Sequence, residues 1–175
     1  MLVIVARPHK REPQVDESPV VLDDKGEALS KSLPELLGGF EVEVGAALDE
    51  VVVTVKARDV LDICRTVKDD PRLDFNYLRC LSIVDYRERM EVVYHLFSLA
   101  KRQKMVVKAS VSPDEPNIPS VVSVWRGADW FEREGHDLFG IVFQGHPNPA
   151  PLLLYEGFQG YPGRKDFPFH DYDEW

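Results

Sequence analysis

The segment from Asp129 to His170 constrains the fold of this chain more than any other. It opens with the charged run Glu132-Arg133-Glu134, and it then becomes a ribbon interrupted by five prolines between Pro147 and Pro168. So many chain breakers exclude a regular helix or sheet, yet the ribbon holds too many large apolar residues to be a solvated linker. An apolar ribbon without regular structure needs a surface to lie on. We expect that surface to come from its own domain or from another protein.

The composition excludes several classes of function. A length of 175 residues fits one domain, and the formal net charge of −9 argues against nucleic acid and against direct contact with an anionic membrane. No stretch approaches the roughly 20 apolar residues of a membrane span, so we expect no direct membrane insertion and no signal peptide at the N-terminus. The two cysteines, Cys64 and Cys80, form no C-x-x-C motif, so the chain cannot supply four thiolates to an iron–sulfur cluster.

The pattern of apolar residues predicts an α+β fold. Helical spacing is found over 27–37, 57–67 and 121–138, with Ser120 as the expected cap of the third helix. Strand patterns cover 40–44, 51–55, 81–85, 90–99 and 103–111, and 114–119 is expected to be a loop. We therefore predict a mixed or antiparallel sheet of about five strands, with helices on one face and a long irregular C-terminal tail. The expected parts are a flexible N-terminal arm (1–26), the α+β domain (27–140) and an extended partner-binding tail (141–175).

The charged end of the third helix has two readings. Arg133 and Asp137 are four residues apart and can pair, as can Glu132 and His136, which would suit a solvated helix end. However, large apolar residues surround these charges, and a glycine inside a helix costs about 1 kcal/mol against alanine. We expect Gly135 to permit the close approach of another backbone, and we favour a contact surface.

A metal site or acid/base centre is the rival chemical hypothesis. Glu132, His136, Asp137 and His146 are residue types that can bind zinc, and a metal-dependent hydrolase could be built on them. The chain has no H-E-x-x-H motif, and His146 precedes a proline, so we expect its ring instead to bind backbone and fix a turn. No arrangement of nucleophile and base, and no nicotinamide or flavin motif, is present.

The triplet Arg164-Lys165-Asp166 lacks the glycine-rich loop of a phosphate site. It is suited to clasp carboxylates, on its own domain or on a partner.

Several of these motifs occur together in one known family. The residues Glu132-Arg133-Glu134, Asp137, Gly140-Ile141, Gly145-His146-Pro147 and Arg164-Lys165-Asp166-Phe167-Pro168 resemble the signature of the C-type subunit of respiratory complex I, the NADH:quinone oxidoreductase, and of the related subunit of energy-converting membrane hydrogenases. The resemblance implies a non-catalytic, peripheral scaffold subunit on the cytoplasmic side of the cell membrane. It implies no cofactor on this chain, although the parent complex carries iron–sulfur clusters and quinone and can carry flavin. The implied partners are the large hydrogenase-like subunit (the D-type) and the small cluster-bearing subunit (the B-type). The implied interface residues are Glu132, Arg133, Glu134, Asp137, His146, Arg164, Lys165 and Asp166.

Two departures from the complex I pattern keep the type of complex open. The pattern has a basic pair where this chain has Ala150-Pro151, and a large apolar residue where it has Gly163. A quinone-reducing complex is favoured, with an energy-converting [NiFe] hydrogenase as the alternative. We also expect the tail before Tyr155 to pack on its own sheet. The part after Tyr161 should be mobile, extended or held by a neighbour, with Arg164 facing the partner.

Overall fold

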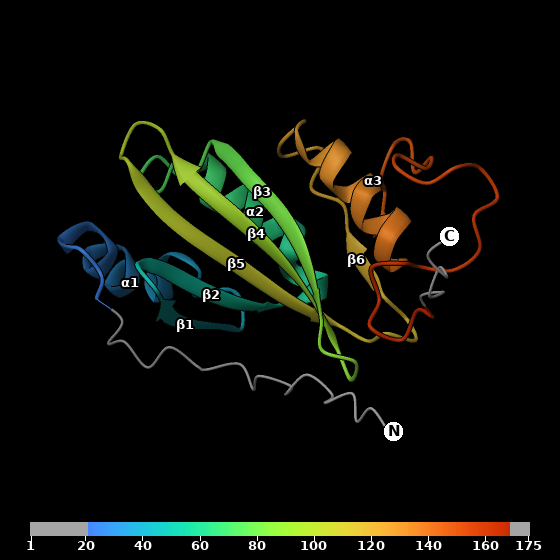
Figure 1. Cartoon of the computed structure of the whole chain (residues 1–175). Coiled ribbons are helices and arrows are strands. Elements are labelled where there is room, and N and C mark those ends of the chain that lie inside the picture. The colour runs from blue at the N-terminus through green and yellow to red at the C-terminus, as the bar shows by residue number, and fades with distance from the viewer. Residues whose placement is uncertain (1–20, 169–175) are drawn as a thin grey trace, which may run out of the picture.

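The structure is a computed structural model that describes residues 21–168 (Figure 1). Most of the predicted N-terminal arm, and the last seven residues of the tail, lie outside the described residues. The first helix, α1 (Asp24–Leu36), begins three residues before the predicted start of the domain at Glu27. Asp23 caps it by accepting a hydrogen bond from the Gly26 N–H at 2.7 Å.

Five strands form the main sheet, which confirms the predicted fold class. They are β1 (Val42–Ala47), β2 (Glu50–Lys56), β3 (Tyr77–Asp85), β4 (Met90–Ser98) and β5 (Gln103–Val111). Their order is β1-β2-β5-β4-β3, and the sheet is mixed because β2 and β5 run parallel while the other pairs are antiparallel. The helix α2 (Val60–Asp69), preceded by the short η1 (Ala57–Asp59), provides the crossover that a parallel pair requires.

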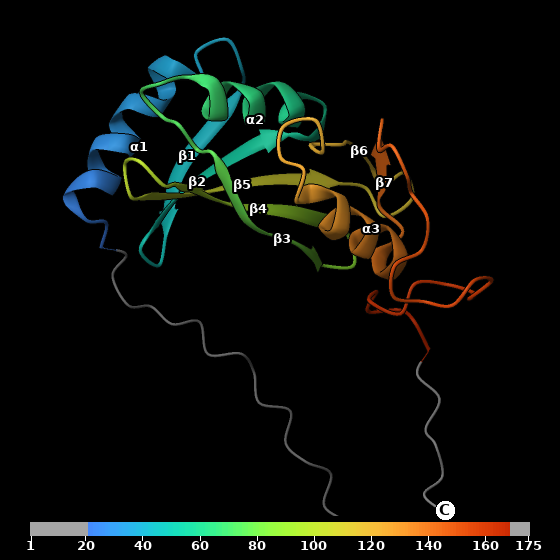
Figure 2. The same cartoon turned by 90° about the horizontal axis from the view of Figure 1, so that it is seen from above.

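The core lies between one face of this sheet and the helices α1 and α2, as Figure 2 shows. Alternate residues of each strand point into it, for example Val53 on β2, Val107 on β5 and Tyr94 on β4, all with no exposed surface. The face of α2 that carries Ile63 and Cys64 covers them.

Two short strands correct the prediction for the segments on either side of the last helix. β6 (Asn117–Pro119), expected to be a loop, pairs in parallel with β7 (Val142–Gln144). The tail therefore does form a ladder with its own domain over three residues. The prediction failed because the first tail proline, Pro147, comes only after this pairing has ended.

The last helix, α3 (Ala128–Phe139), is shorter than predicted. Residues 121–127 form turns, and Ser120 does not cap a helix but donates its hydroxyl to Glu132 at 2.6 Å. Val121 and Trp125 are nevertheless buried, which is why the apolar spacing ran on without a break. No helix within residues 21–168 is long and apolar enough to cross a membrane.

Gly135 fixes how α3 lies beside the edge strand β3. A Cβ at this position would stand 2.4 Å from Ile83 Cδ1 and 3.3 Å from the Phe143 ring. The glycine therefore permits close packing, as expected, but against side chains of its own domain rather than another backbone. Helix α3 is thus placed along the sheet edge with its opposite side free for the tail (Figure 1).

We expect Gly135→Ala to destabilise the domain by about 1 kcal/mol, because overpacking costs about 1–3 kcal/mol while alanine returns about 1 kcal/mol of helix propensity. Urea unfolding measures the change. Adding Ile83→Val removes the clashing Cδ1 atom and should abolish the cost of Gly135→Ala. Gly39→Ala is the matched control, since its Cβ would meet nothing within 4 Å. Equal effects of Gly39→Ala and Gly135→Ala would contradict this packing.

Candidate functional site

The carboxylate of Asp137 on α3 is the centre of the candidate site. Its Oδ2 accepts hydrogen bonds from three consecutive backbone N–H groups, those of Leu152 (3.0 Å), Leu153 (2.7 Å) and Leu154 (2.8 Å). Burial acts to raise the pKa of Asp137, but these donors outweigh it and hold the pKa below its ordinary value. The ionised carboxylate thus binds the main chain of the tail.

Arg133 lies one turn earlier on α3 and binds the residues just before. Its Nε–H donates to the Ala150 carbonyl at 2.9 Å, and its Nη2 donates to the Pro151 carbonyl at 2.8 Å. The pairing of Arg133 with Asp137, which their spacing allowed and which suited the disfavoured reading of a solvated helix end, is not formed: within the described part of the chain, no ion pair joins them. Instead the cation takes two carbonyls and the anion takes three N–H groups of residues 150–154, which we call the strap.

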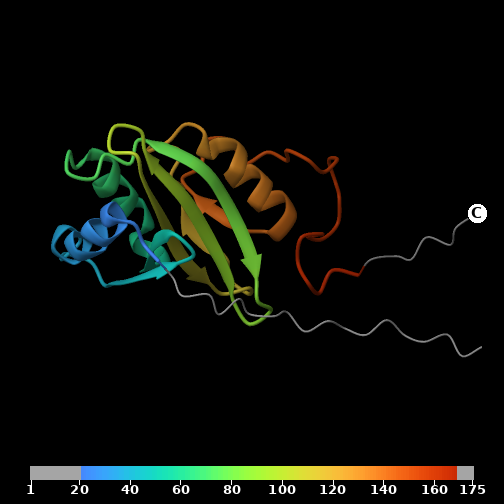
Figure 3. The same cartoon turned by 60° about the vertical axis from the view of Figure 1, so that its left-hand side comes forward.

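Recognition through the main chain leaves the Leu153 side chain outside, while Leu152 and Leu154 are half-buried. Leu153 is 59% exposed, and Tyr155 directly after the strap is 72% exposed. Figure 3 shows this part of the chain looping out beside α3 before it returns toward the helix end. The expectation that the tail before Tyr155 packs on its own sheet holds for β7 but not for the strap.

A second set of contacts fastens the tail at the C-terminal end of α3. The Gly163 N–H donates to the Leu138 carbonyl (2.8 Å), and Arg164 Nε donates to the Phe139 carbonyl (2.7 Å). The last carbonyls of a helix have no partner within the helix, so the tail here acts as a cap. The expected freedom of the tail after Tyr161 is thus corrected for Gly163 to Lys165, and Arg164 binds its own domain.

The third contact at this end uses a residue that the sequence analysis did not single out. Asp85 at the end of β3 accepts the Lys165 N–H at 2.7 Å and the Arg87 N–H at 2.6 Å. Burial would raise the pKa of Asp85, but these two donors and the nearby cations lower it below its ordinary value. Its position before the β3–β4 turn was the only signal in the sequence.

Gly163 is explained by the same contact. A Cβ there would stand 2.8 Å from the Phe139 ring and 2.9 Å from the Leu138 carbonyl oxygen. The glycine that departs from the complex I pattern is therefore required by the close approach of the tail to α3 in this chain.

Glu132 and His146 bind the segments that flank α3, before the helix at residues 120–121 and after it in the turn that follows β7. Glu132 is fully buried and accepts from the Ser120 hydroxyl (2.6 Å) and the Val121 N–H (2.7 Å), and burial raises its pKa to about 7. It does not bind His136, whose Nδ1 instead contacts the Ile141 carbonyl at 2.9 Å.

The ring of His146 fixes the turn after β7, as predicted. Its Nδ1 accepts from the Asn148 N–H at 3.0 Å, and its Nε2 lies 3.3 Å from the Asp129 carbonyl oxygen and 3.2 Å from Asp129 Oδ1.

The two remaining predicted site residues, Glu134 and Asp166, are exposed. Neither side chain makes a hydrogen bond or ion pair within residues 21–168. The Lys165 side chain also projects outward, with its Nζ 5.8 Å from the Tyr86 ring centroid. The structure thus brings together Arg133 and Asp137 on the strap, and Arg164 and Lys165 at the helix end. It leaves Glu134 and Asp166 free at the surface.

The metal hypothesis finds no arrangement to support it. His146 Nε2 lies 3.9 Å from Glu132 Oε2 and 3.2 Å from Asp129 Oδ1, but Glu132 is held by Ser120 and Val121, and His136 binds the Ile141 carbonyl. In the described region no group of three or more histidine, cysteine, aspartate or glutamate side chains is placed to hold a metal ion.

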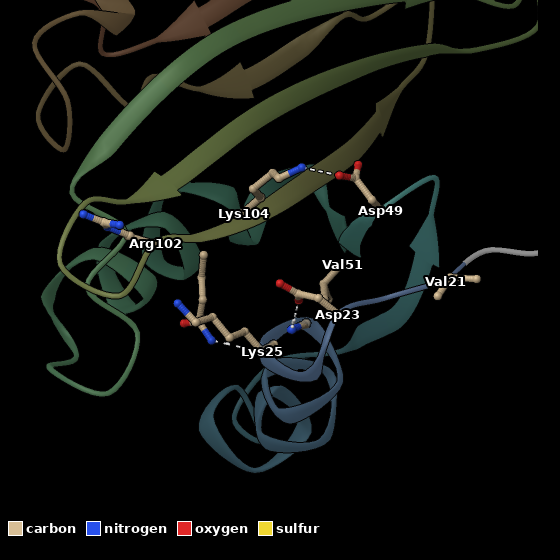
Figure 4. A pocket seen from close by; sticks show the side chains of 9 residues that line it. Val21, Asp23, Lys25, Asp49, Val51, Arg102 and Lys104 are labelled. Carbon is tan, nitrogen blue, oxygen red and sulfur yellow. Dashed lines mark hydrogen bonds and ion pairs between the residues drawn. The ribbon is translucent and has the colours of Figure 1, made fainter.

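A cavity of about 140 Å³ at the N-terminus of α1 is lined by charged side chains of both signs (Figure 4). Lys104 is turned toward Asp49, with which it pairs, and Asp23 is engaged in capping the helix. Arg102 lies apart from these pairs. The charges are used within the cavity, so it has no convergent set of groups for a ligand.

The fold and the site together define a class: a small α+β domain whose charged helix binds its own irregular C-terminal segment. The family model described as "Respiratory-chain NADH dehydrogenase, 30 Kd subunit" matches residues 53–173, and the chain belongs to this family.

Curated relatives agree with this assignment. The C subunit of the NADH-quinone oxidoreductase of Burkholderia multivorans is 39% identical over 160 residues, which cover 86% of this chain and 80% of the relative. The corresponding C subunit of Rhodopseudomonas palustris is 40% identical over 156 residues, covering 87% and 74%.

Two solved structures share the fold. A trypsin-resistant fragment of Nqo5 (1–134) is 30% identical with a TM-score of 0.56, covering 69% of this chain and 98% of the fragment. A chain of the membrane-bound sulfane sulfur reductase, an archaeal respiratory membrane complex, is 27% identical with a TM-score of 0.70, covering 83% and 86%. The resemblance found in the sequence is thereby confirmed.

The hydrogen bonds from the strap N–H groups to the Asp137 carboxylate should weaken in acid. Because the folded-state pKa of Asp137 is lowered, its stabilising contribution is present above the ordinary carboxyl pKa of about 3.9 and is lost as the pH falls through the folded value. We expect Asp137→Asn to cost about 2 kcal/mol at pH 7, and this gap from the wild type should close in acid. Urea unfolding from neutral to acidic pH measures it. Glu134→Gln, three residues away, is the control and should stay within about 0.5 kcal/mol of the wild type throughout. A gap for Asp137→Asn that is independent of pH would contradict the role of the charge.

Proposed function

We propose that this chain is a non-catalytic scaffold subunit of a membrane-bound NADH:quinone oxidoreductase of the complex I type. It docks on the large hydrogenase-like subunit (the D-type), near the small cluster-bearing subunit (the B-type), on the cytoplasmic side of the cell membrane. It supports electron transfer to quinone by holding these subunits in place. The names of the relatives support the type of complex, and the geometry of the strap supports the mode of docking.

The observation that carries the docking role is that the strap is bound through its main chain. Arg133 and Asp137 bind only carbonyl and N–H groups, so the apolar side chains of Leu153 and Tyr155 stay largely exposed. Trp130, one turn before Arg133 on α3, is also 64% exposed. Burying a large apolar side chain contributes about 1.5–3 kcal/mol, and a partner surface is the natural place for that burial.

The residues implied at the interface fall into two groups, those that bind the chain itself and those that are left for the partner. Arg133, Asp137, Arg164 and the Lys165 main chain position the tail, and Glu132 with His146 supports the turn that leads into it. Glu134, Asp166 and the Lys165 side chain remain for direct contact with the partner. Most of the motif residues therefore position the tail within the chain, and the positioned tail in turn contacts the partner.

The proposal assigns no cofactor to this chain. Iron–sulfur clusters, quinone and any flavin belong to the other subunits of the complex. Of the two cysteines, Cys64 is fully buried, and burial raises the pKa of its thiol, which disfavours the thiolate that a metal would need. The purified chain should be colourless and free of stoichiometric metal.

The second candidate is the equivalent subunit of an energy-converting [NiFe] hydrogenase, which the sequence motifs also resemble. The match to a chain of the sulfane sulfur reductase supports only that this fold also occurs in a respiratory membrane complex named for another reaction. The scaffold role is the same in both. The sequence of the large subunit encoded by a neighbouring gene distinguishes the two candidates. Four nickel-binding cysteines in it would indicate a hydrogenase, and their absence a quinone-reducing complex.

We expect the double substitution Leu153→Asp with Trp130→Asp to abolish co-purification with the large subunit. Both side chains are exposed in the isolated chain, so its melting temperature should change little, while charges in an apolar interface oppose docking. Leu48→Asp is the matched control, because Leu48 is 80% exposed on the β1–β2 turn, away from the tail. Retained co-purification of the double variant would overturn the assignment of this surface.

A further inference from the structure

A cavity of about 170 Å³ lies between α3 and the tail, just beyond the strap. Its lining includes Asp137 and the aromatic residues Tyr155, Phe158 and Tyr161, together with Pro151 and Leu154 of the strap. It is too small for a further segment of chain and has room for the end of one side chain. One carboxylate together with aromatic rings favours a positively charged group at the end of that side chain.

The Asp137 carboxylate is only partly used by the strap. All three strap N–H groups bind Oδ2, and within residues 21–168 no hydrogen bond is formed to Oδ1. The residue is buried, with a relative exposure of 8%, and the lowered pKa keeps it ionised. Oδ1 is not one of the fully enclosed polar atoms of the described residues, so solvent reaches it. An ionised, accessible carboxylate oxygen is an acceptor for a charged N–H group.

The rings add a second attraction for positive charge. Tyr155 and Phe158 meet edge to face with their centroids 5.4 Å apart. The ring of Tyr161 is already engaged by the chain's own Arg164, whose guanidinium lies 4.8 Å from the ring centroid, so Tyr155 and Phe158 are the rings left for a cation of the partner. A cation over an aromatic face within about 6 Å is attracted by the ring quadrupole.

Other ligand classes fit less well. An anion would be repelled by Asp137, and a metal ion would find one carboxylate oxygen and no second acidic ligand among the lining residues. His136 also faces the cavity, but its Nδ1 binds the Ile141 carbonyl, so the ring is held by the chain itself.

We propose that this cavity is a receptor for a cationic side chain, a lysine or an arginine, presented by the partner protein. The proposal deepens the docking function above and rests on it for the identity of the partner. It adds that a single positive residue of the partner enters beside the strap and binds Asp137 Oδ1 and the rings of Tyr155 and Phe158.

The cavity can be tested on the isolated chain with a small probe. N-butylguanidinium carries the arginine head group, and N-butylurea has nearly the same shape without the charge. In a titration followed by amide chemical shifts, we expect N-butylguanidinium to shift Tyr155, Phe158 and Tyr161, and N-butylurea to bind at least about tenfold more weakly. Equal binding of the two probes, or shifts elsewhere only, would overturn the proposal.

Tyr155→Leu provides a matched variant, since the side chain makes no hydrogen bond to Arg133 or Asp137, and the change removes the ring with its edge-to-face contact to Phe158. It should weaken N-butylguanidinium binding several-fold, whereas Leu153→Ala, a change to an exposed strap residue that does not line the cavity, should leave it unchanged. Equal effects of the two variants would also overturn the proposal. If the large subunit is captured but the probe does not bind, the cavity proposal fails and the docking function stands. If the probe binds and capture fails, the cavity is supported and the docking function fails.

Discussion

The placing of the tail depends on buried carboxylates that bind main-chain N–H groups. Asp137 takes three consecutive donors of the strap, and Asp85 takes the Lys165 N–H. A segment rich in proline and glycine cannot satisfy its own backbone groups by forming regular structure, and unpaired backbone groups are costly wherever they are buried. Fixed acceptors on α3 and β3, together with Arg133 as donor, supply the partners that the tail cannot supply itself.

This arrangement separates the order of the tail from the burial of its side chains. In a strand or helix the main chain is satisfied internally and side-chain packing sets the position. Here the charges set the position, and residues such as Leu153 and Tyr155 are left exposed. A tail that is already ordered loses less conformational entropy when it binds a partner, which favours the affinity of the complex.

The sheet and its helices could be predicted from the sequence because their signals are local. Alternation in β5 and the β-branched run in β2 gave both strands to within one residue, although their parallel pairing depends on the crossover through α2. The extent of α3 was overestimated because the buried Val121 and Trp125 continue the helical spacing through non-helical turns. Tertiary burial and helical periodicity cannot be told apart in such a stretch.

The site residues could be named from the sequence, but their partners could not. Spacing along the helix allowed pairs four residues apart, yet Glu132 binds Ser120 twelve residues away, and Asp85 on β3 binds the Lys165 N–H across eighty residues. The N–H groups of the strap leave no trace in the sequence, since any residue other than proline carries one.

Hydrogen exchange of the isolated chain reports on the fastening of the tail, because the tail is held by hydrogen bonds from backbone N–H groups to the carboxylates of Asp137 and Asp85. We expect the amides of Leu152, Leu153, Leu154 and Lys165 to exchange slowly without any partner present. The amides of the exposed residues Glu156 and Gly157 should exchange fast. Exchange of all of these amides at the rate of an unprotected chain would contradict it, and would mean that the tail is fastened only by the partner.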